Sequence, residues 1–344
     1  MAIVKISEIT EKVKNIFMHE GVDEKTASTV AEVLADTQIK GILTHGFMRV
    51  PLYIECIRSG GVLPTGDIEI ISDSPTMAIV SGKGGLGIAV AKEAMELAIS
   101  KAEATGVGIV SVYGSHHLGA TGYYANMCAE RGMIGISMSN GNRMVAATGS
   151  CSPTIGNNPF SYAVPAGKHG TVLYDIAMSV GSDMKILAML KNGERIPDGW
   201  FVDKLGRPSN NGEDFRNGGV LLPFGGYKGY GLAIMVEMLA GVLPGAANPA
   251  TVKAWNKVPQ ENGGNVGHFF MALDISKITD RDAFISRAEA LIDELATAKL
   301  AEGADKIYYP GEKEKISKDA CLAKGEVEVS DAILEAIEKL AAEI

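Results

Sequence analysis

Residues 107–138 read VGIVSVYGSHHLGATGYYANMCAERGMIGISM, and the fold class follows from this segment. Residues 107–112 form an apolar run that is typical of a strand buried on both faces. Residues 123–131 are expected to form a helix, and residues 133–138 a second strand. A strand, a helix and another strand in succession indicate an α/β protein whose sheet is covered by helices.

The flanking sequence extends this pattern in both directions. Two further strands are expected over residues 67–72 and 76–81, on either side of Asp73-Ser74-Pro75. Residues 231–243 form a strongly apolar segment, which predicts a fully buried helix. Other helices are expected within residues 3–40 and over residues 88–104, 280–298 and 330–344.

The amino-acid composition limits the kinds of function that the chain can have. The chain has 344 residues, and its 32 Lys and Arg against 41 Asp and Glu give a net charge of −9. An acidic chain without a basic block is a poor binder of nucleic acids and anionic membranes, so neither is expected as a partner. No apolar run is long enough to span a membrane. The four cysteines show no ligand-like spacing and are interpreted as free thiols of a cytoplasmic protein.

A glycine-rich segment at residues 82–87, GKGGLG, matches the pattern of a dinucleotide-binding loop. It follows a strand and precedes a helix, as that motif requires. However, the next strand ends at Val112-Tyr113-Gly114, without the acidic residue that would hold a ribose hydroxyl. We therefore favour a structural strand-to-helix turn over a phosphate-binding loop.

Histidines mark two polar clusters. Thr44-His45-Gly46 is followed by Arg49, whose guanidinium suits a substrate carboxylate. The second cluster contains His116 and His117 between glycines, directly after a buried strand. Because open α/β sheets bind ligands at the carboxyl ends of strands, either histidine there is a candidate acid or base. A metal site is not expected, because no carboxylate or cysteine lies at ligand spacing from either cluster.

Two later clusters carry charged residues in glycine-rich or strand-end positions. Asp175 closes an apolar strand within Tyr174-Asp175-Ile176-Ala177. Lys228 lies between glycines at the start of the apolar helix, where a cation and free backbone N–H groups suit a phosphate.

Taken in order, these segments resemble the malate/L-lactate dehydrogenase type-2 family over residues 5–340. Each motif is weak by itself, but their shared order is specific. The matching motifs are Thr44-His45-Gly46 with Arg49, His117-x-Gly119-x-x-Gly122-Tyr123-Tyr124, Gly156-Asn157-Asn158-Pro159, Asp175-x-Ala177, Pro223-x-x-Gly226-Tyr227-Lys228-Gly229-x-Gly231-Leu232 and Gly267-His268-Phe269-Phe270.

The resemblance implies an α/β fold that is not a Rossmann fold. It implies a mixed-sheet cofactor domain, here residues 76–244, and a largely helical domain built from both chain ends, here residues 1–75 with 245–344. It also implies a homodimer that transfers hydride to or from NAD or NADP.

The resemblance also assigns roles to individual residues. It makes His117 the catalytic acid or base, with His45 and Arg49 on the substrate side. Cofactor contacts are implied at Gly141, Asp175, Ile176, Ala177 and Lys228, and in the late segment Pro310, Gly311 and Glu312.

The expected reaction is hydride transfer between NAD(P) and C2 of a small 2-hydroxy or 2-oxo carboxylic acid. A ureidoglycolate dehydrogenase is the first alternative, because residues 308–311 and 136–138 resemble that branch. A cyclic imino-acid reductase is a further alternative. A non-catalytic nucleotide-binding protein is the alternative from a different class.

Overall fold

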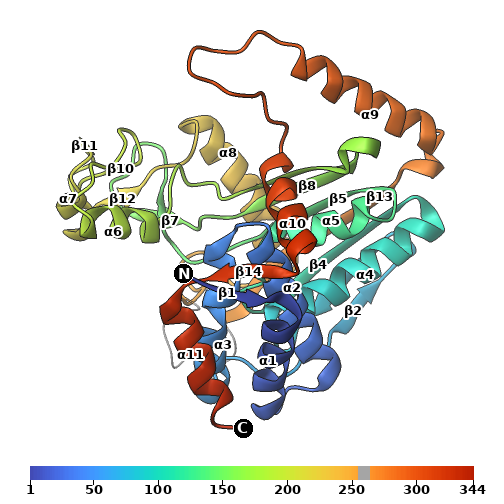
Figure 1. Ribbon diagram of the computed structural model, residues 1–344, viewed down its shortest axis with the longest axis horizontal. Helices are drawn as coiled ribbons and strands as arrows, with labels where there is room; N and C mark the ends of the chain where they lie inside the picture. The colour runs from blue at the N-terminus through green and yellow to red at the C-terminus, as the bar shows by residue number, and fades with distance from the viewer. Residues whose placement is uncertain (255–263) are drawn as a thin grey trace.

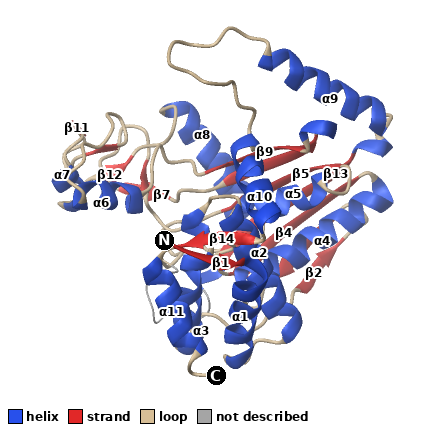
Figure 2. Cartoon of the chain, viewed as in Figure 1, coloured by secondary structure: helices blue, strands red, loops and turns tan. Residues whose placement is uncertain are grey.

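Strands β4 (Val107–Ser115) and β5 (Met133–Ser139) do not pair with each other, because strand β13 (Val266–Asp274) lies between them. In the computed structural model, which describes residues 1–254 and 264–344, β13 runs antiparallel to both neighbours. Strands β4 and β5 therefore point the same way, and their carboxyl ends lie at one edge of the sheet (Figures 1 and 2).

Among the described residues, the central sheet has seven strands in the order β2-β3-β4-β13-β5-β8-β9. Its other members are β2 (Glu69–Asp73), β3 (Met77–Ser81), β8 (Phe160–Pro165) and β9 (Thr171–Ile176). Strands β3 and β4 are parallel, whereas the remaining neighbours are antiparallel. This arrangement confirms the expected mixed sheet and α/β class.

Helices cover both faces of this sheet. Phe270 and Ala272 of β13 pack into the core beneath α4 (Gly87–Thr105) and α5 (Thr121–Ala129). Phe269 and Met271 point to the opposite face, because side chains alternate along a strand. There they meet α8 (Tyr227–Val236) and the π-helix η4 that continues it (Glu237–Val242).

The expected full burial of residues 231–243 is wrong for this chain. One stripe of α8 and η4, with Ala233, Val236 and Ala240, is buried against the sheet. The other side is open, and Met238 and Val242 are 54% and 57% exposed. A helix that packs on one face of a sheet buries only that stripe, even when its remaining residues are apolar.

The two chain ends meet in one helical part of the molecule. Strand β1 (Ala2–Lys5) pairs antiparallel with β14 (Glu326–Val329). Side chains from both ends, among them Phe17, Leu34, Val327 and Ile337, share one hydrophobic core. The helices around it are α1 (Ile6–His19), α2 (Glu24–Ile39), α3 (Val50–Arg58), α10 (Glu312–Lys324) and α11 (Asp331–Ala341).

A small lobe projects to one side of the molecule in Figure 1. Its sheet has the order β11-β10-β12-β6-β7. The strands are β6 (Val145–Ala146), β7 (Pro153–Ile155), β10 (Phe201–Val202), β11 (Pro208–Ser209) and β12 (Val220–Leu221), with helices α6 (Asp183–Lys191) and α7 (Gly212–Arg216). The predicted domain limits at residues 75 and 245 stay predictions. Strand β13 falls within residues 245–344, which the resemblance assigns to the helical domain, but it is an inner strand of the central sheet.

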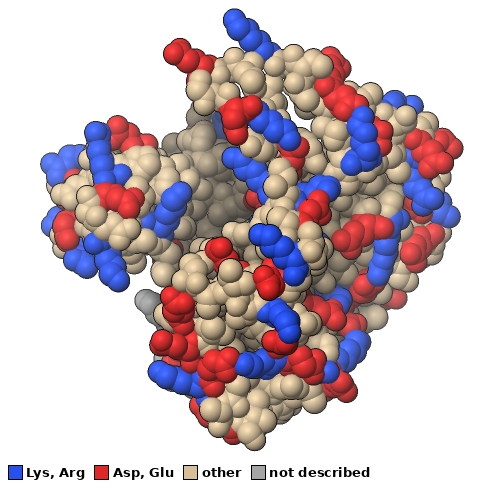
Figure 3. Space-filling model, viewed as in Figure 1, with Lys and Arg blue, Asp and Glu red and all other residues tan. Residues whose placement is uncertain are grey.

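Charged side chains of both signs are intermixed over the face that Figure 3 shows. Within the described part of the chain, no helix combines the length and apolarity that a membrane crossing needs. The four cysteines are free thiols, as expected, and Cys56 and Cys128 are buried.

Candidate active site

A cavity of about 540 Å³ opens at the edge of the sheet where the carboxyl ends of β4, β5 and β9 lie. This volume is in the usual range of small-molecule sites, which is roughly 300–1,000 Å³. The wall is completed by the short helix η1 (Leu43–His45) and by the segment that leads into α10. Segments far apart in the sequence therefore enclose one site.

His117 lines this cavity, directly after β4. The phenol oxygen of Tyr53 lies 2.6 Å from its Nδ1, and the backbone N–H of Gly119 donates to the same nitrogen at 3.3 Å. A phenol can donate to a bare nitrogen or accept from an N–H, so Tyr53 can pair with either protonation state of Nδ1. This contact holds the imidazole through Nδ1. Because Tyr53 belongs to α3, the position of that helix fixes the orientation of the ring.

Burial lowers the pKa of His117 well below its ordinary value, and a positive charge on His45 or Arg49 acts in the same direction. The imidazole is therefore neutral at pH 7 before any ligand binds. Burial also raises the pKa of Tyr53, which keeps the phenol protonated. The pair thus rests as a neutral imidazole beside a neutral phenol.

The first predicted polar cluster lies against the second. The imidazole of His45 stacks on that of His117, with ring centroids 5.6 Å apart and planes tilted by 20°. Its Nδ1 is 2.9 Å from the hydroxyl of Thr44, and burial lowers its pKa to about 4. Arg49 follows in η2 (Phe47–Arg49), where its Nε donates to the carbonyl of Thr44 at 2.6 Å.

The adjacent histidine has a different environment. His116 is 1% exposed, burial lowers its pKa to about 4, and it is not among the described residues that line the cavity. His268 of β13 is also buried and bridges β4 and β5, with Nε2 2.8 Å from Ser115 Oγ and Nδ1 2.9 Å from Ser139 Oγ. Of the two histidines that the sequence left open, geometry favours His117.

Asp175 ties the end of β9 to the start of α5. Its carboxylate accepts hydrogen bonds from the hydroxyl of Thr121 and the backbone N–H of Gly122, both at 2.7 Å. A Cβ at Gly122 would lie 2.7 Å from Asp175 Oδ2, so the close approach requires glycine. Since α5 begins four residues after His117, this bond also fixes the loop that carries the imidazole. Asp175, Ile176 and Ala177 all line the cavity.

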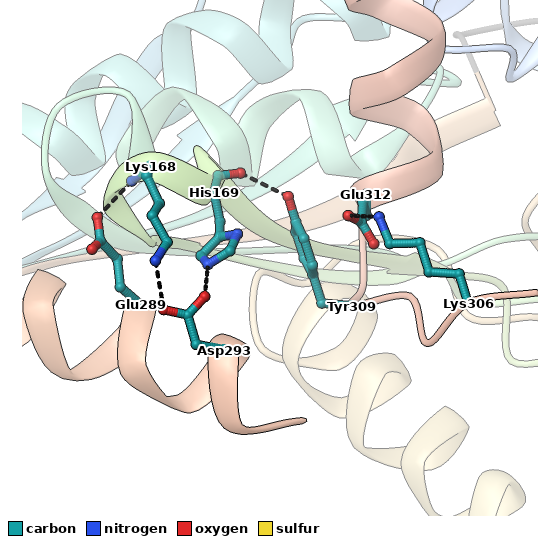
Figure 4. A network of polar contacts seen from close by, with 7 residues as sticks. All are labelled: Lys168, His169, Glu289, Asp293, Lys306, Tyr309 and Glu312. Atoms are coloured by element: carbon teal, nitrogen blue, oxygen red, sulfur yellow. Dashed lines mark hydrogen bonds and ion pairs between the residues drawn. The ribbon is translucent and has the colours of Figure 1, made fainter. Parts of the chain in front are cut away.

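The late segment forms a further part of the wall, where Tyr308, Tyr309, Pro310 and Gly311 line the cavity. The carbonyl of Pro310 accepts from the N–H of Leu173 on β9 at 3.0 Å. The hydroxyl of Tyr309 donates to the carbonyl of His169 at 2.8 Å. Figure 4 shows that His169 and Lys168 both reach Asp293 of α9 (Arg281–Ala296), so this wall is braced from outside the cavity.

Four predicted residues are not among the described residues that line the cavity: Arg49, Gly141, Lys228 and Glu312. The charge of Arg49 still acts on His45 and His117, because it lowers the pKa of both. Gly141 follows the lining residue Asn140. Lys228 is exposed at the second position of α8. Glu312 pairs with Lys306 at 2.5 Å (Figure 4).

The glycine-rich loop at residues 82–87 lies elsewhere. Its backbone N–H groups are engaged within the chain: Gly84 donates to Gly114, Gly85 to Gly82, and Leu86 to Thr65. Donors that are already engaged cannot cradle a phosphate without breaking these bonds. This agrees with the structural interpretation of the loop.

Sequence reasoning missed Tyr53, Thr121 and Lys313. Tyr53 comes four residues after Arg49, on the helix that follows the first polar cluster, and that spacing was the available signal. Lys313 lines the cavity and holds its ammonium 4.6 Å from the centre of the Tyr308 ring. In the described residues no group of three His, Cys, Asp or Glu side chains has the arrangement of a metal site.

Comparison with known proteins identifies the relatives of this chain. A family model described as malate/L-lactate dehydrogenase matches residues 4–338. A malate dehydrogenase of Pyrococcus abyssi is 37% identical over 97% of this chain and 92% of that protein. A ureidoglycolate dehydrogenase (NAD(+)) of Escherichia coli O157:H7 is 31% identical over 96% of this chain and 94% of that protein.

Solved structures give the same result. The sulfolactate dehydrogenase from Methanocaldococcus jannaschii superimposes with a TM-score of 0.92 at 32% identity. The match covers 99% of this chain and 97% of that one, so both the fold and the chain length agree.

Proposed function

The chain belongs to the malate/L-lactate dehydrogenase family, and from this premise we propose that it transfers a hydride between NAD or NADP and C2 of a small 2-hydroxy or 2-oxo carboxylic acid. One observation carries the proposal. His117, held through Nδ1, lines the same cavity as five of the eight residues expected at cofactor positions: Asp175, Ile176, Ala177, Pro310 and Gly311.

The chemistry of the cavity wall fits a nicotinamide cofactor. Leu173, Ile176, Ala177 and Pro159 offer apolar surface to flat rings, while Lys313 offers a cation to a phosphate. The bound cofactor would supply or accept the hydride, and the protein would supply position and electrostatics. Lys228 remains a proposed phosphate contact because of its place at the start of α8.

His117 is proposed as the acid and base. In oxidation, the tautomer with a bare Nε2 would take the proton of the substrate hydroxyl, while its Nδ1–H donates to Tyr53 Oη in place of accepting from the Gly119 N–H. In reduction, the imidazolium would return that proton to the carbonyl oxygen as the hydride arrives. An anionic substrate beside the ring raises the pKa of His117, which makes the imidazolium accessible when the site is filled.

Arg49 and His45 are proposed to hold the substrate carboxylate. The charge of the guanidinium lowers the pKa of both imidazoles, so Arg49 acts electrostatically on His45 and His117. A bidentate pair with a carboxylate would orient C2 beside His117. His45, stacked on His117, would form the floor against which the substrate lies.

We also infer a homodimer, supported by the open side of α8 and η4. Leu232, Met238, Val242 and Leu243 are each 42–57% exposed on this side, and Glu237 is turned inward. Apolar side chains at helical spacing, without charges among them, favour contact with a second copy. The mass in solution should be twice 36.2 kDa. Met238→Glu should halve it, whereas Leu205→Glu, at an exposed leucine of the small lobe, should not. A monomeric wild type contradicts the inference.

A ureidoglycolate dehydrogenase is the second candidate. Residues 308–311, whose sequence resembles that branch, line the cavity and therefore border any ligand. The likeness to the E. coli enzyme extends over nearly the whole chain.

Absorbance of the reduced cofactor tests these alternatives. NADH and NADPH are each offered with oxaloacetate, pyruvate and a cyclic imino acid, and NAD and NADP with malate, sulfolactate and ureidoglycolate. Turnover with a 2-oxo or 2-hydroxy acid is expected. Turnover confined to ureidoglycolate would replace the first candidate by the second, and cofactor binding without any turnover would favour a non-catalytic protein.

A further inference from the structure

Glu237 is a buried carboxylate that the proposed chemistry does not use. It is 6% exposed and lies at the first position of the π-helix η4, on the face that packs against the sheet. π-helical turns are rare and occur frequently at functional sites. A charge buried at such a turn needs partners, because an unpaired carboxylate in the interior is costly.

The partners of Glu237 are two asparagines from different loops. The Nδ2 group of Asn140 donates to Oε1 at 3.2 Å, and that of Asn158 donates to Oε2 at 3.0 Å. Each amide uses its second N–H on a carbonyl, Asn140 on Ala247 at 2.8 Å and Asn158 on Ala233 at 3.0 Å. Both amide groups are thus fully engaged as donors, with the carboxylate between them.

Neither asparagine has an easy alternative orientation. The Oδ1 of Asn140 accepts from the backbone N–H of Gly267 at 2.9 Å, so a rotated amide would lose that bond. A rotated Asn158 amide would turn Oδ1 toward the carbonyl of Ala233 and toward Glu237 Oε2, two acceptors that then lose their donor. Burial raises the pKa of Glu237, and the two amides oppose that shift.

Glycine makes room for this contact. A Cβ at Gly241, one turn along η4, would lie 2.5 Å from Glu237 Oε1 and 2.8 Å from Asn140 Nδ2. The helix backbone therefore approaches the pair as closely as a glycine allows.

The two loops that Glu237 joins border the candidate active site. Asn140 and Ser139, at the end of β5, line the cavity, as do Asn157 and Pro159 on either side of Asn158. Ile176 and Ala177 line the same cavity, and Ile176 pairs with Phe160, the residue after Pro159.

We propose that Glu237 is a positioning residue: by accepting from Asn140 and Asn158 together, it fixes the two loops that form the cofactor side of the cavity. This inference rests on the proposed function, since the cofactor is assigned to that cavity. Glu237 acts through the two amides and is not expected to touch cofactor or substrate.

Glu237→Gln is the direct test, because the glutamine keeps the size of the side chain and replaces one acceptor by an NH₂ group. One asparagine must then turn or move away. We expect the Kd for NADH or NADPH, measured by quenching of protein or cofactor fluorescence, to rise about tenfold, the scale of one hydrogen bond to a charged group. The KM for cofactor should rise in parallel, while kcat changes less than about threefold, since His117 is untouched.

Asp203→Asn is the matched control. The Asp203 carboxylate accepts from the N–H groups of Leu205 and Arg207 and from Arg207 Nε, within the small lobe. It should lower thermal stability and leave the cofactor Kd unchanged. If Glu237→Gln fails to fold, Glu237→Asp tests the proposal instead. Aspartate keeps the negative charge, but its side chain is one methylene shorter, so the carboxylate lies farther from both amides.

The outcomes separate the two proposals. If the wild type binds neither NADH nor NADPH, the proposed function fails. If the wild type binds and a folded Glu237 variant has the wild-type Kd, the positioning role is wrong. A loss of kcat at unchanged Kd, or a loss of stability alone, would equally overturn it.

Discussion

The phenol oxygen of Tyr53 lies 2.6 Å from Nδ1 of His117, although 64 residues separate the two in the chain. Tyr53 is 1% exposed and belongs to the core that both chain ends share, whereas His117 belongs to a loop of the central sheet. The hydrogen bond therefore couples the helical part of the molecule to the candidate catalyst.

Removing the hydroxyl of Tyr53 should slow turnover without weakening the binding of the cofactor. In Tyr53→Phe, the tautomer that carries the proton on Nδ1 loses the phenol oxygen that would accept it. We expect kcat to fall about tenfold, the cost of an unpaired buried polar group. The cofactor Kd should stay within a factor of two. Tyr162→Phe, on β8, is the control, and equal kcat values for both variants would refute a role for Tyr53.

Replacing the imidazole should be more damaging. His117→Ala removes the acid and base and is expected to lower kcat by roughly 10²-fold or more. Cofactor titration should resemble that of the wild type, because the cofactor wall is intact. If turnover survives, the role passes to His116 or His45.

The pH dependence of oxidation follows from the lowered pKa of His117, which burial causes first and His45 and Arg49 reinforce. The base acts when neutral, so a lowered pKa extends activity toward acid. We expect kcat/KM for oxidation to show no inflection at the ordinary histidine value of 6.5 and to fall only at lower pH. Reduction consumes a proton and should speed up as pH falls. A half-loss of oxidation near pH 6.5 would contradict the assignment.

An ion triad that joins the two chain ends contributes to the way the stability of the fold depends on pH in the acid range. Asp36 of α2 lies 2.5 Å from Lys40 and 2.7 Å from Lys318 of α10. Burial acts to raise the pKa of Asp36, but the two ammonium groups outweigh it and hold the pKa below its ordinary value. The ionised carboxylate therefore stabilises the fold above the unfolded-state pKa of about 4, and this is lost as pH falls through the folded-state value.

Asp36→Asn leaves the two ammonium groups facing each other. It should lower the free energy of unfolding at pH 7 by about 3 kcal/mol, the scale for removing one partner of a buried pair. Denaturant titrations from pH 3 to pH 7 should show a shallower acid decline in the variant than in the wild type. Parallel declines would show that Asp36 does not titrate on unfolding.

Local sequence patterns predicted much of the central sheet and its helices, because their segments are long and periodic. The strands expected over residues 107–112 and 133–138 are present as β4 and β5, but their separation by β13 was not foreseen. That pairing depends on packing between segments more than 120 residues apart, which no local pattern encodes. The strands of the small lobe, two or three residues long, are too short for alternation to show.

The residues of the candidate site also fall into two groups: those that local sequence patterns predicted and those that only the folded structure identifies. His117, His45 and Asp175 stand next to glycines or at strand ends, and these local signals pointed to them. Tyr53 and Glu237 carry no such signal, since each sits among apolar residues of a helix and is identified only by what it contacts across the fold. The exposed side of α8 was missed because hydrophobicity predicts burial without saying whether a neighbouring element or a second chain provides it.

Direct transfer of the hydride is the central claim, and isotope transfer tests it most directly. The wild type is incubated in ordinary water with oxidised cofactor and with whichever 2-hydroxy acid turns over, deuterated at C2. Mass spectrometry of the reduced cofactor should find one deuterium per molecule formed, because the hydride passes from C2 to the nicotinamide without exchange. Reduced cofactor without deuterium would contradict the account.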